Sequence, residues 1–64
     1  MLKNRLKEFR ESKGMTQEQL AKAAGLSRQT ISKIENNEEV SVNVKTIVKI
    51  AEIFSVSPGE IFLF

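Results

Sequence analysis

The feature that most constrains the fold is a helix-start signal that occurs four times along the chain. In each copy, an apolar residue precedes a polar residue that can cap the N-terminus of a helix. The four pairs are Met15 with Thr16, Leu26 with Ser27, Val42 with Asn43, and Val56 with Ser57. Gln19 and Glu60 stand three residues after their caps and complete capping boxes, and Pro58 occupies a first helical position. We therefore predict helices that begin after residues 16, 27, 43 and 57.

An amphipathic segment near the N-terminus predicts one more helix. Leu2, Leu6 and Phe9 recur at helical spacing between residues 2 and 12, and Gly14 is placed to take the left-handed conformation that ends a helix. The single proline and the few alternating β-branched residues argue against strands. We expect an all-α fold with residues 1–64 as a single domain, because 64 residues cannot build a second core.

The connection between the second and third predicted helices is short. Only Gly25 and Leu26 separate Ala24 from the Ser27 cap. Gly25 can take a positive φ, and the small side chains of Ala21 and Ala24 let two helices approach closely. This spacing predicts a helix-turn-helix formed by the second and third helices.

The third helix has one face without acidic residues. At about 100° per residue, Ile31 and Ile34 fall on the side that would be buried. The opposite arc holds Arg28, Gln29, Ser32, Lys33 and Asn36. Arginine and lysine can donate to guanine O6 and N7, and glutamine can pair with adenine N6 and N7. We interpret the arc as a DNA-contacting surface, because an ordinary solvated face mixes acidic with basic residues.

Basic residues are concentrated in the first half of the chain. Residues 1–33 hold eight basic and three acidic groups, whereas residues 34–64 hold two basic and five acidic groups, which together give the net charge of +2. We expect Arg5 and Lys22 to add general attraction to the DNA backbone.

Two segments, MTQEQLAKAAGLSRQTISKIENN and VKIAEIFSVSPGEIF, resemble the Cro and lambda-repressor-like family of the xenobiotic-response-element type. The resemblance covers Leu6 to about Phe62. It implies a five-helix lambda-repressor-like DNA-binding domain, in which the third helix enters the major groove of double-stranded DNA while the second crosses the backbone. By position, Arg28, Gln29 and Lys33 resemble the residues that contact bases, and Ser32 is a possible fourth.

The resemblance also suggests contacts with the DNA backbone. Gln17, at the first position of the second helix, resembles a phosphate anchor assisted by backbone N–H groups. Asn36 and Asn37 resemble the backbone-contacting corner after the third helix, and we expect Ser27 to lie at the same surface. Asn37 stands where many relatives have glycine, and asparagine tolerates the left-handed conformation.

Arg10 and Glu35 resemble an internal ion pair of the family. Such a pair would fix the angle of the third helix. The alternative is that Arg10 contacts phosphate directly.

The chain ends in an apolar run. Ile61 fits the core, and Phe62 fits either the core or a candidate dimer interface formed by Phe62, Leu63 and Phe64. An exposed apolar patch marks a partner surface, and a two-fold contact needs no second protein. The alternative is that Phe64 folds back onto its own chain.

Composition excludes several functional classes. Without Cys or His, the chain offers no thiolate metal site and no imidazole acid or base, so we expect no enzyme activity, no metal and no cofactor. No apolar run approaches the roughly 20 residues that span a bilayer, which predicts a cytoplasmic protein without a membrane partner. A chain of 64 residues has no room for a ligand-binding domain, so no small-molecule ligand is expected.

These observations lead to one principal hypothesis. We expect the protein to be a sequence-specific DNA-binding transcriptional regulator that acts as a homodimeric repressor on a palindromic operator. The alternative is an antitoxin or another protein-interaction module that uses the apolar C-terminus.

Overall fold

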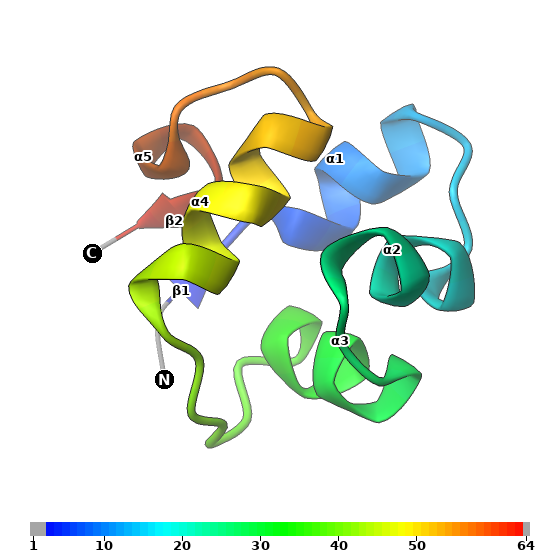
Figure 1. Ribbon diagram of the computed structural model, residues 1–64, viewed down its shortest axis with the longest axis vertical. Coiled ribbons are helices and arrows are strands. Elements are labelled where there is room, and N and C mark those ends of the chain that lie inside the picture. Colours follow the sequence, from blue (N-terminus) through cyan, green and yellow to red (C-terminus); the bar gives the residue numbers. More distant parts are fainter. Residues whose placement is uncertain (1–2, 64) are drawn as a thin grey trace.

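The computed structural model describes residues 3–63, without the side chain of residue 63, and this part of the chain forms five helices and one small sheet (Figure 1). The helices are α1 (Leu6–Ser12), α2 (Gln17–Ala24), α3 (Arg28–Glu35), α4 (Val44–Ile53) and α5 (Pro58–Ile61). The strands are β1 (Lys3–Asn4) and β2 (Phe62–Leu63). The predicted five-helix fold is confirmed.

Capping hydrogen bonds establish the four predicted helix starts. The first three caps accept from a backbone N–H three residues further on: Thr16 from Gln19 at 3.0 Å, Ser27 from Thr30 at 3.1 Å, and Asn43 from Thr46 at 2.8 Å. At the fourth start, the Glu60 carboxylate accepts from the Ser57 N–H at 2.9 Å, and Pro58 is the first helical residue. These bonds satisfy N–H groups that have no partner within the helix.

The N-terminus differs from the sequence-based prediction. α1 begins at Leu6 rather than near Leu2, because Asn4 Oδ1 accepts from the Leu6 N–H at 3.0 Å and Lys3 and Asn4 form a strand. Lys3 and Asn4 pair antiparallel with β2. The prediction of no strands was therefore wrong, since strands of two residues leave no alternating pattern in the sequence. Leu2 lies outside the described residues.

The core lies where the helices meet, and its largest fully buried side chains are Leu6, Leu20, Ile31, Ile34, Ile50, Ile61 and Phe62. Phe62 corrects one expectation, because its side chain is 0% exposed within a single chain and cannot form part of an exposed dimer patch. The side chain of Leu63 and all of Phe64 lie outside the described residues, so the remainder of that proposed interface is a prediction.

The helix-turn-helix occupies one side of the molecule (Figure 1). α2 and α3 pack against each other, and Gly25 joins them with a φ of 72°, in the left-handed region that favours glycine. α5 and the β1–β2 pair lie on the opposite side in the same view. Within residues 3–63, no helix has the length and apolar character needed to cross a membrane.

Candidate nucleic-acid interface

The two sides of α3 face different surroundings. Ile31 and Ile34 are fully buried, which confirms the predicted inner side. On the outer side Ser32 is half-buried, and the exposed residues are Arg28, Gln29, Lys33 and Asn36 at the C-cap. Glu35, the acidic residue of α3, has a side chain only 2% exposed. The exposed surface of α3 therefore carries basic and amide groups without a carboxylate.

Glu35 is turned inward by an ion pair with α1. Its Oε2 lies 2.6 Å from Arg10 Nε, and its Oε1 lies 3.3 Å from Arg10 Nη2. Arg10 Nη1 also donates to the carbonyl oxygen of Met15 at 2.7 Å. The hydrogen bond to Glu35 raises the pKa of Arg10 above its ordinary value, although burial acts in the opposite direction. Arg10 thereby joins α1, α3 and the α1–α2 connection.

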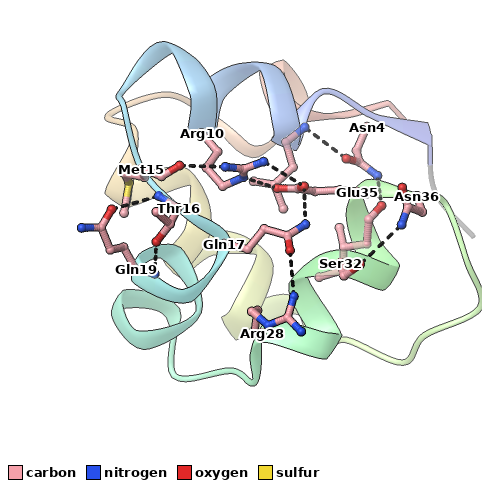
Figure 2. A network of polar contacts seen from close by, with 12 residues as sticks. Asn4, Arg10, Met15, Thr16, Gln17, Gln19, Arg28, Ser32, Glu35 and Asn36 are labelled. Atoms are coloured by element: carbon pink, nitrogen blue, oxygen red, sulfur yellow. Dashed lines mark hydrogen bonds and ion pairs between the residues drawn. The ribbon is translucent and has the colours of Figure 1, made fainter.

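Gln17 extends this network toward the surface (Figure 2). Its Nε2 donates to Glu35 Oε1 at 3.0 Å, and its Oε1 accepts from Arg28 Nη1 at 3.4 Å. Around the first turn of α2, an open hollow of about 660 Å³ is lined by Arg10, Thr16, Gln17, Glu18, Gln19, Lys22 and Arg28. The structure thus brings two predicted backbone contacts, Gln17 and Lys22, to the same hollow as the predicted base-contacting Arg28.

The remaining predicted backbone contacts occupy different places. Ser27 is exposed at the start of α3, where it serves as the N-cap. Asn37 has a φ of 57°, the left-handed conformation expected for this corner, and Asn36 Nδ2 donates to Ser32 Oγ at 3.4 Å. Arg5 directly precedes α1, and its Nε lies 3.8 Å from Glu8 Oε2. Arg5 does not line the hollow.

Asn4 is a contact that sequence reasoning missed. Its Nδ2 donates to the Ile34 carbonyl oxygen at 2.7 Å and to Asn37 Oδ1 at 3.2 Å, while its Oδ1 accepts from the Leu6 N–H at the start of α1. Asn4 therefore joins β1 to the end of α3. An asparagine can form an Asx turn with the N–H two residues further on, but the bonds from Asn4 to α3 and Asn37 cross 30 or more positions and leave no local pattern.

Comparisons with known proteins agree with this architecture. The helix-turn-helix family profile HTH_3 matches residues 6–61. MJ0272 of Methanocaldococcus jannaschii, an uncharacterized HTH-type transcriptional regulator, is 43% identical over 63 residues, which cover 98% of this chain and 94% of that protein.

Two solved structures show the same fold. SinR, the master regulator for biofilm formation, in complex with DNA matches with a TM-score of 0.73 and 28% identity, over 83% of this chain and 84% of that chain. FeII HppE matches with a TM-score of 0.78 and 28% identity, but the match covers 89% of this chain and only 30% of HppE. The similarity to HppE is therefore confined to a part of that protein.

In this chain, α2 and α3 are joined by a short connection, and the exposed face of α3 is basic. These features are typical of helix-turn-helix proteins. The chain belongs to the Cro/C1-type helix-turn-helix family, since the family profile covers most of its length.

Proposed function

We propose that this protein is a regulator of transcription that binds a specific sequence of double-stranded DNA as a homodimer and represses by occupying a promoter. The observation that carries the proposal is the exposed, acid-free face of α3 beside the first turn of α2. Membership of a family of HTH-type transcriptional regulators and the likeness to DNA-bound SinR support it.

The base-contacting role falls to Arg28, Gln29 and Lys33, with Ser32 beside them. With α3 in the major groove, the arginine and lysine donate to guanine, while Gln29 makes paired hydrogen bonds with adenine. Each good pair discriminates against the wrong base by about 1–3 kcal/mol. α3 is also the element whose inner side is anchored by buried isoleucines and by the Glu35 ion pair, so its outer side is presented on a rigid support.

Contacts with the DNA backbone would fix the orientation of the domain. Gln17 and Lys22 line the hollow at the start of α2, where backbone N–H groups favour an anion. Ser27 lies at the start of α3, and Asn36 and Asn37 lie at its end, while Arg5 contributes general attraction from α1. Such contacts position a protein on DNA without distinguishing sequences.

A homodimer would place two copies of α3 in successive major grooves, about 34 Å apart, on a two-fold symmetric operator. The proposed interface lies at the C-terminal end, at Leu63 and Phe64, because Phe62 belongs to the core. The alternative function, an antitoxin or another protein-interaction module, uses the same apolar end, and the burial of Phe62 reduces the patch available to it.

The test compares one proposed base contact with one proposed phosphate contact, on a duplex selected by the wild-type protein from a random pool. Gln29→Ala should weaken binding to the selected duplex far more than to random DNA and leave the salt dependence unchanged. Lys22→Ala should weaken binding to both duplexes alike and reduce the slope of log K against log [salt] by about one. If the two variants behave alike in both measurements, the assigned roles are wrong.

A further inference from the structure

Asn4 lies between the start of α1 and the end of α3. Its Oδ1 accepts from the Leu6 N–H at 3.0 Å, and its Nδ2 donates to the Ile34 carbonyl oxygen at 2.7 Å (Figure 2). The same Nδ2 donates to Asn37 Oδ1 at 3.2 Å. Asn37 is exposed at the corner after α3, where the proposed function has a contact with the DNA backbone. A residue of β1 therefore binds a side chain of the proposed DNA-contacting surface.

The backbone of Asn4 is fixed by the C-terminal strand. Asn4 pairs with Phe62 in the β1–β2 sheet, and the Arg5 N–H donates to the Ile61 carbonyl oxygen at 2.7 Å. The side chains of Ile61 and Phe62 are fully buried in the core. Asn4 consequently contacts α3 from a backbone that is tied to the core through β2.

The backbone of Asn37 is fixed by the end of α3. Asn37 has a φ of 57°, and its N–H donates to the Ile34 carbonyl oxygen at 3.1 Å. The next N–H, that of Glu38, donates to the Lys33 carbonyl oxygen at 2.9 Å. These two bonds around a left-handed residue form a Schellman motif, a common helix ending. The two backbones that carry the Asn4 and Asn37 carboxamides are therefore both held in place.

Their hydrogen-bond partners determine which way the two carboxamides point. A backbone N–H can only donate and a backbone carbonyl can only accept, so Asn4 must turn its oxygen toward Leu6 and its nitrogen toward Ile34. Because the Asn4 nitrogen also faces Asn37, Asn37 must present its oxygen to Asn4. The donating end of the Asn37 amide is then left on the other branch of an exposed side chain. A phosphate oxygen is a suitable acceptor for this N–H, since hydrogen bonds to charged acceptors are strong.

We infer that Asn4 is a positioning residue that turns the Asn37 amide N–H groups toward a DNA phosphate, so that the β1–β2 pair contributes to DNA binding. This inference rests on the proposed function, in which Asn37 contacts the DNA backbone. Because the contact is exposed to water, its complete loss should cost about three- to tenfold in affinity. Loss of the positioning alone leaves the Asn37 amide present but free to rotate, and should cost about two- to fivefold.

The experiment uses the operator duplex selected by the wild-type protein and a series of derivatives in which one phosphate at a time is replaced by a neutral methylphosphonate. The linkage sensitivity at a position is the ratio of the Kd for the modified duplex to the Kd for the unmodified duplex. Asn37→Gly removes the carboxamide, and glycine adopts a positive φ without strain. Asn37→Gly should lower the linkage sensitivity by about three- to tenfold at one phosphate, which is thereby identified as the partner of Asn37.

Asn4→Ser tests the positioning. The serine hydroxyl can still accept from the Leu6 N–H, but the amide that donates to Ile34 and Asn37 is gone. We expect the linkage sensitivity to fall by about two- to fivefold at the phosphate identified with Asn37→Gly and to stay unchanged at the other phosphates. Added to Asn37→Gly, the Asn4→Ser change should cause no further loss of sensitivity at this phosphate.

A matched variant separates positioning from a loss of stability. Glu60→Ala removes the carboxylate that accepts from the Ser57 N–H at the start of α5, on the side of the molecule opposite the helix-turn-helix (Figure 1). A change that acts only through folding alters the Kd for modified and unmodified duplexes alike, so Glu60→Ala should leave every linkage sensitivity unchanged. Both variants are assayed at a temperature where circular dichroism shows native helix content.

The outcomes are distinct. If folded Asn4→Ser keeps the wild-type sensitivity at the Asn37 phosphate, or weakens binding to every duplex alike, the inference is overturned and the proposed function stands. If Asn37→Gly changes the sensitivity at no phosphate, the backbone-contacting role of Asn37 fails, and the inference fails with it. The base contacts of α3 are tested separately by Gln29→Ala and do not depend on that result.

Discussion

The inner and outer sides of α3 share one helix but obey different requirements. On the inner side, Ile31, Ile34 and Glu35 are buried against α1 and the core, so their volume and pairing matter to folding. On the outer side, Arg28, Gln29 and Lys33 are exposed and contribute little to the folded state. The comparison shows how a small domain can keep a surface free for binding: the polar groups that hold the helix are gathered on its inner side.

The largest expected effect comes from breaking the inner side. Glu35→Ala leaves the Arg10 guanidinium, whose side chain is 11% exposed, without its carboxylate partner, and should destabilise the protein by about 3–5 kcal/mol. A domain of this size has a total stability of about 3–10 kcal/mol, so partial unfolding is expected at 25 °C. Urea denaturation followed by circular dichroism measures the loss.

The control for this change is an exposed ion pair in the same chain. The Arg5 and Glu8 side chains are 51% and 70% exposed, so Glu8→Ala should cost less than about 1 kcal/mol. Equal destabilisation by the two substitutions would contradict the distinction between the inner side and the solvated surface.

The outer side is tested by Arg28→Ala. Discrimination for the base pair that Arg28 contacts should fall by about 1–3 kcal/mol, since a paired contact with guanine is lost. The unfolding free energy without DNA should change by less than about 0.5 kcal/mol, because the side chain is exposed. Fluorescence anisotropy with matched duplexes measures the discrimination, and urea denaturation measures the unfolding free energy. A strongly destabilised Arg28→Ala variant with unchanged base preference would contradict the assignment of Arg28 to the outer, DNA-contacting side.

A third substitution tests the α2–α3 connection, which sets the orientation of both sides of α3. Gly25 has a φ of 72° and a Cβ there would meet only Lys49 Nζ, at 3.9 Å, so Gly25→Ala introduces backbone strain rather than a clash. We expect a loss of about 1–2 kcal/mol in thermal or urea unfolding. The matched control is Gly59→Ala, where φ is not positive and nothing lies within 4 Å of the new Cβ, and a gain of about 0.4–1 kcal/mol is expected. A loss at both positions would show that space, rather than backbone conformation, is limiting.

The smallest expected effect concerns the end of α3. Asn4→Ala removes the hydrogen bonds to the Ile34 carbonyl and to Asn37, together with the bond from the Leu6 N–H, and should cost about 1 kcal/mol in urea denaturation. Asn36→Ala, which removes a longer and exposed bond to Ser32, serves as the comparison and should be nearly neutral. If Asn36→Ala lowers the free energy of unfolding more than Asn4→Ala does, the hydrogen bonds from Asn4 to the end of α3 do not contribute the expected stability.

Features with local causes could be predicted from the sequence. The starts of α2, α3, α4 and α5 follow from capping residues whose partners lie three positions away, and all four were located correctly. The buried side of α3 follows from helical periodicity alone, because Ile31 and Ile34 lie on one side of the helix.

Features that depend on distant parts of the chain could not be predicted in the same way. The β1–β2 pair joins Lys3 to Leu63, and its two-residue strands carry no periodic signal. The bonds from Asn4 to α3, and the position of Gln17 between Glu35 and Arg28, arise only once the helices are packed. Phe62 was assigned to a dimer patch because the apolar run at the end of the chain does not reveal which of its members the core accommodates.

The most direct test of the central claim is selection from a random DNA pool by the wild-type protein and by Gln29→Ala, followed by sequencing of the recovered duplexes. If the outward face of α3 contacts bases, the wild type recovers a shared motif, and the variant recovers the same motif with preference lost at the positions that Gln29 contacts. Recovery of an identical motif by both proteins, or of no shared motif by the wild type, would contradict the claim.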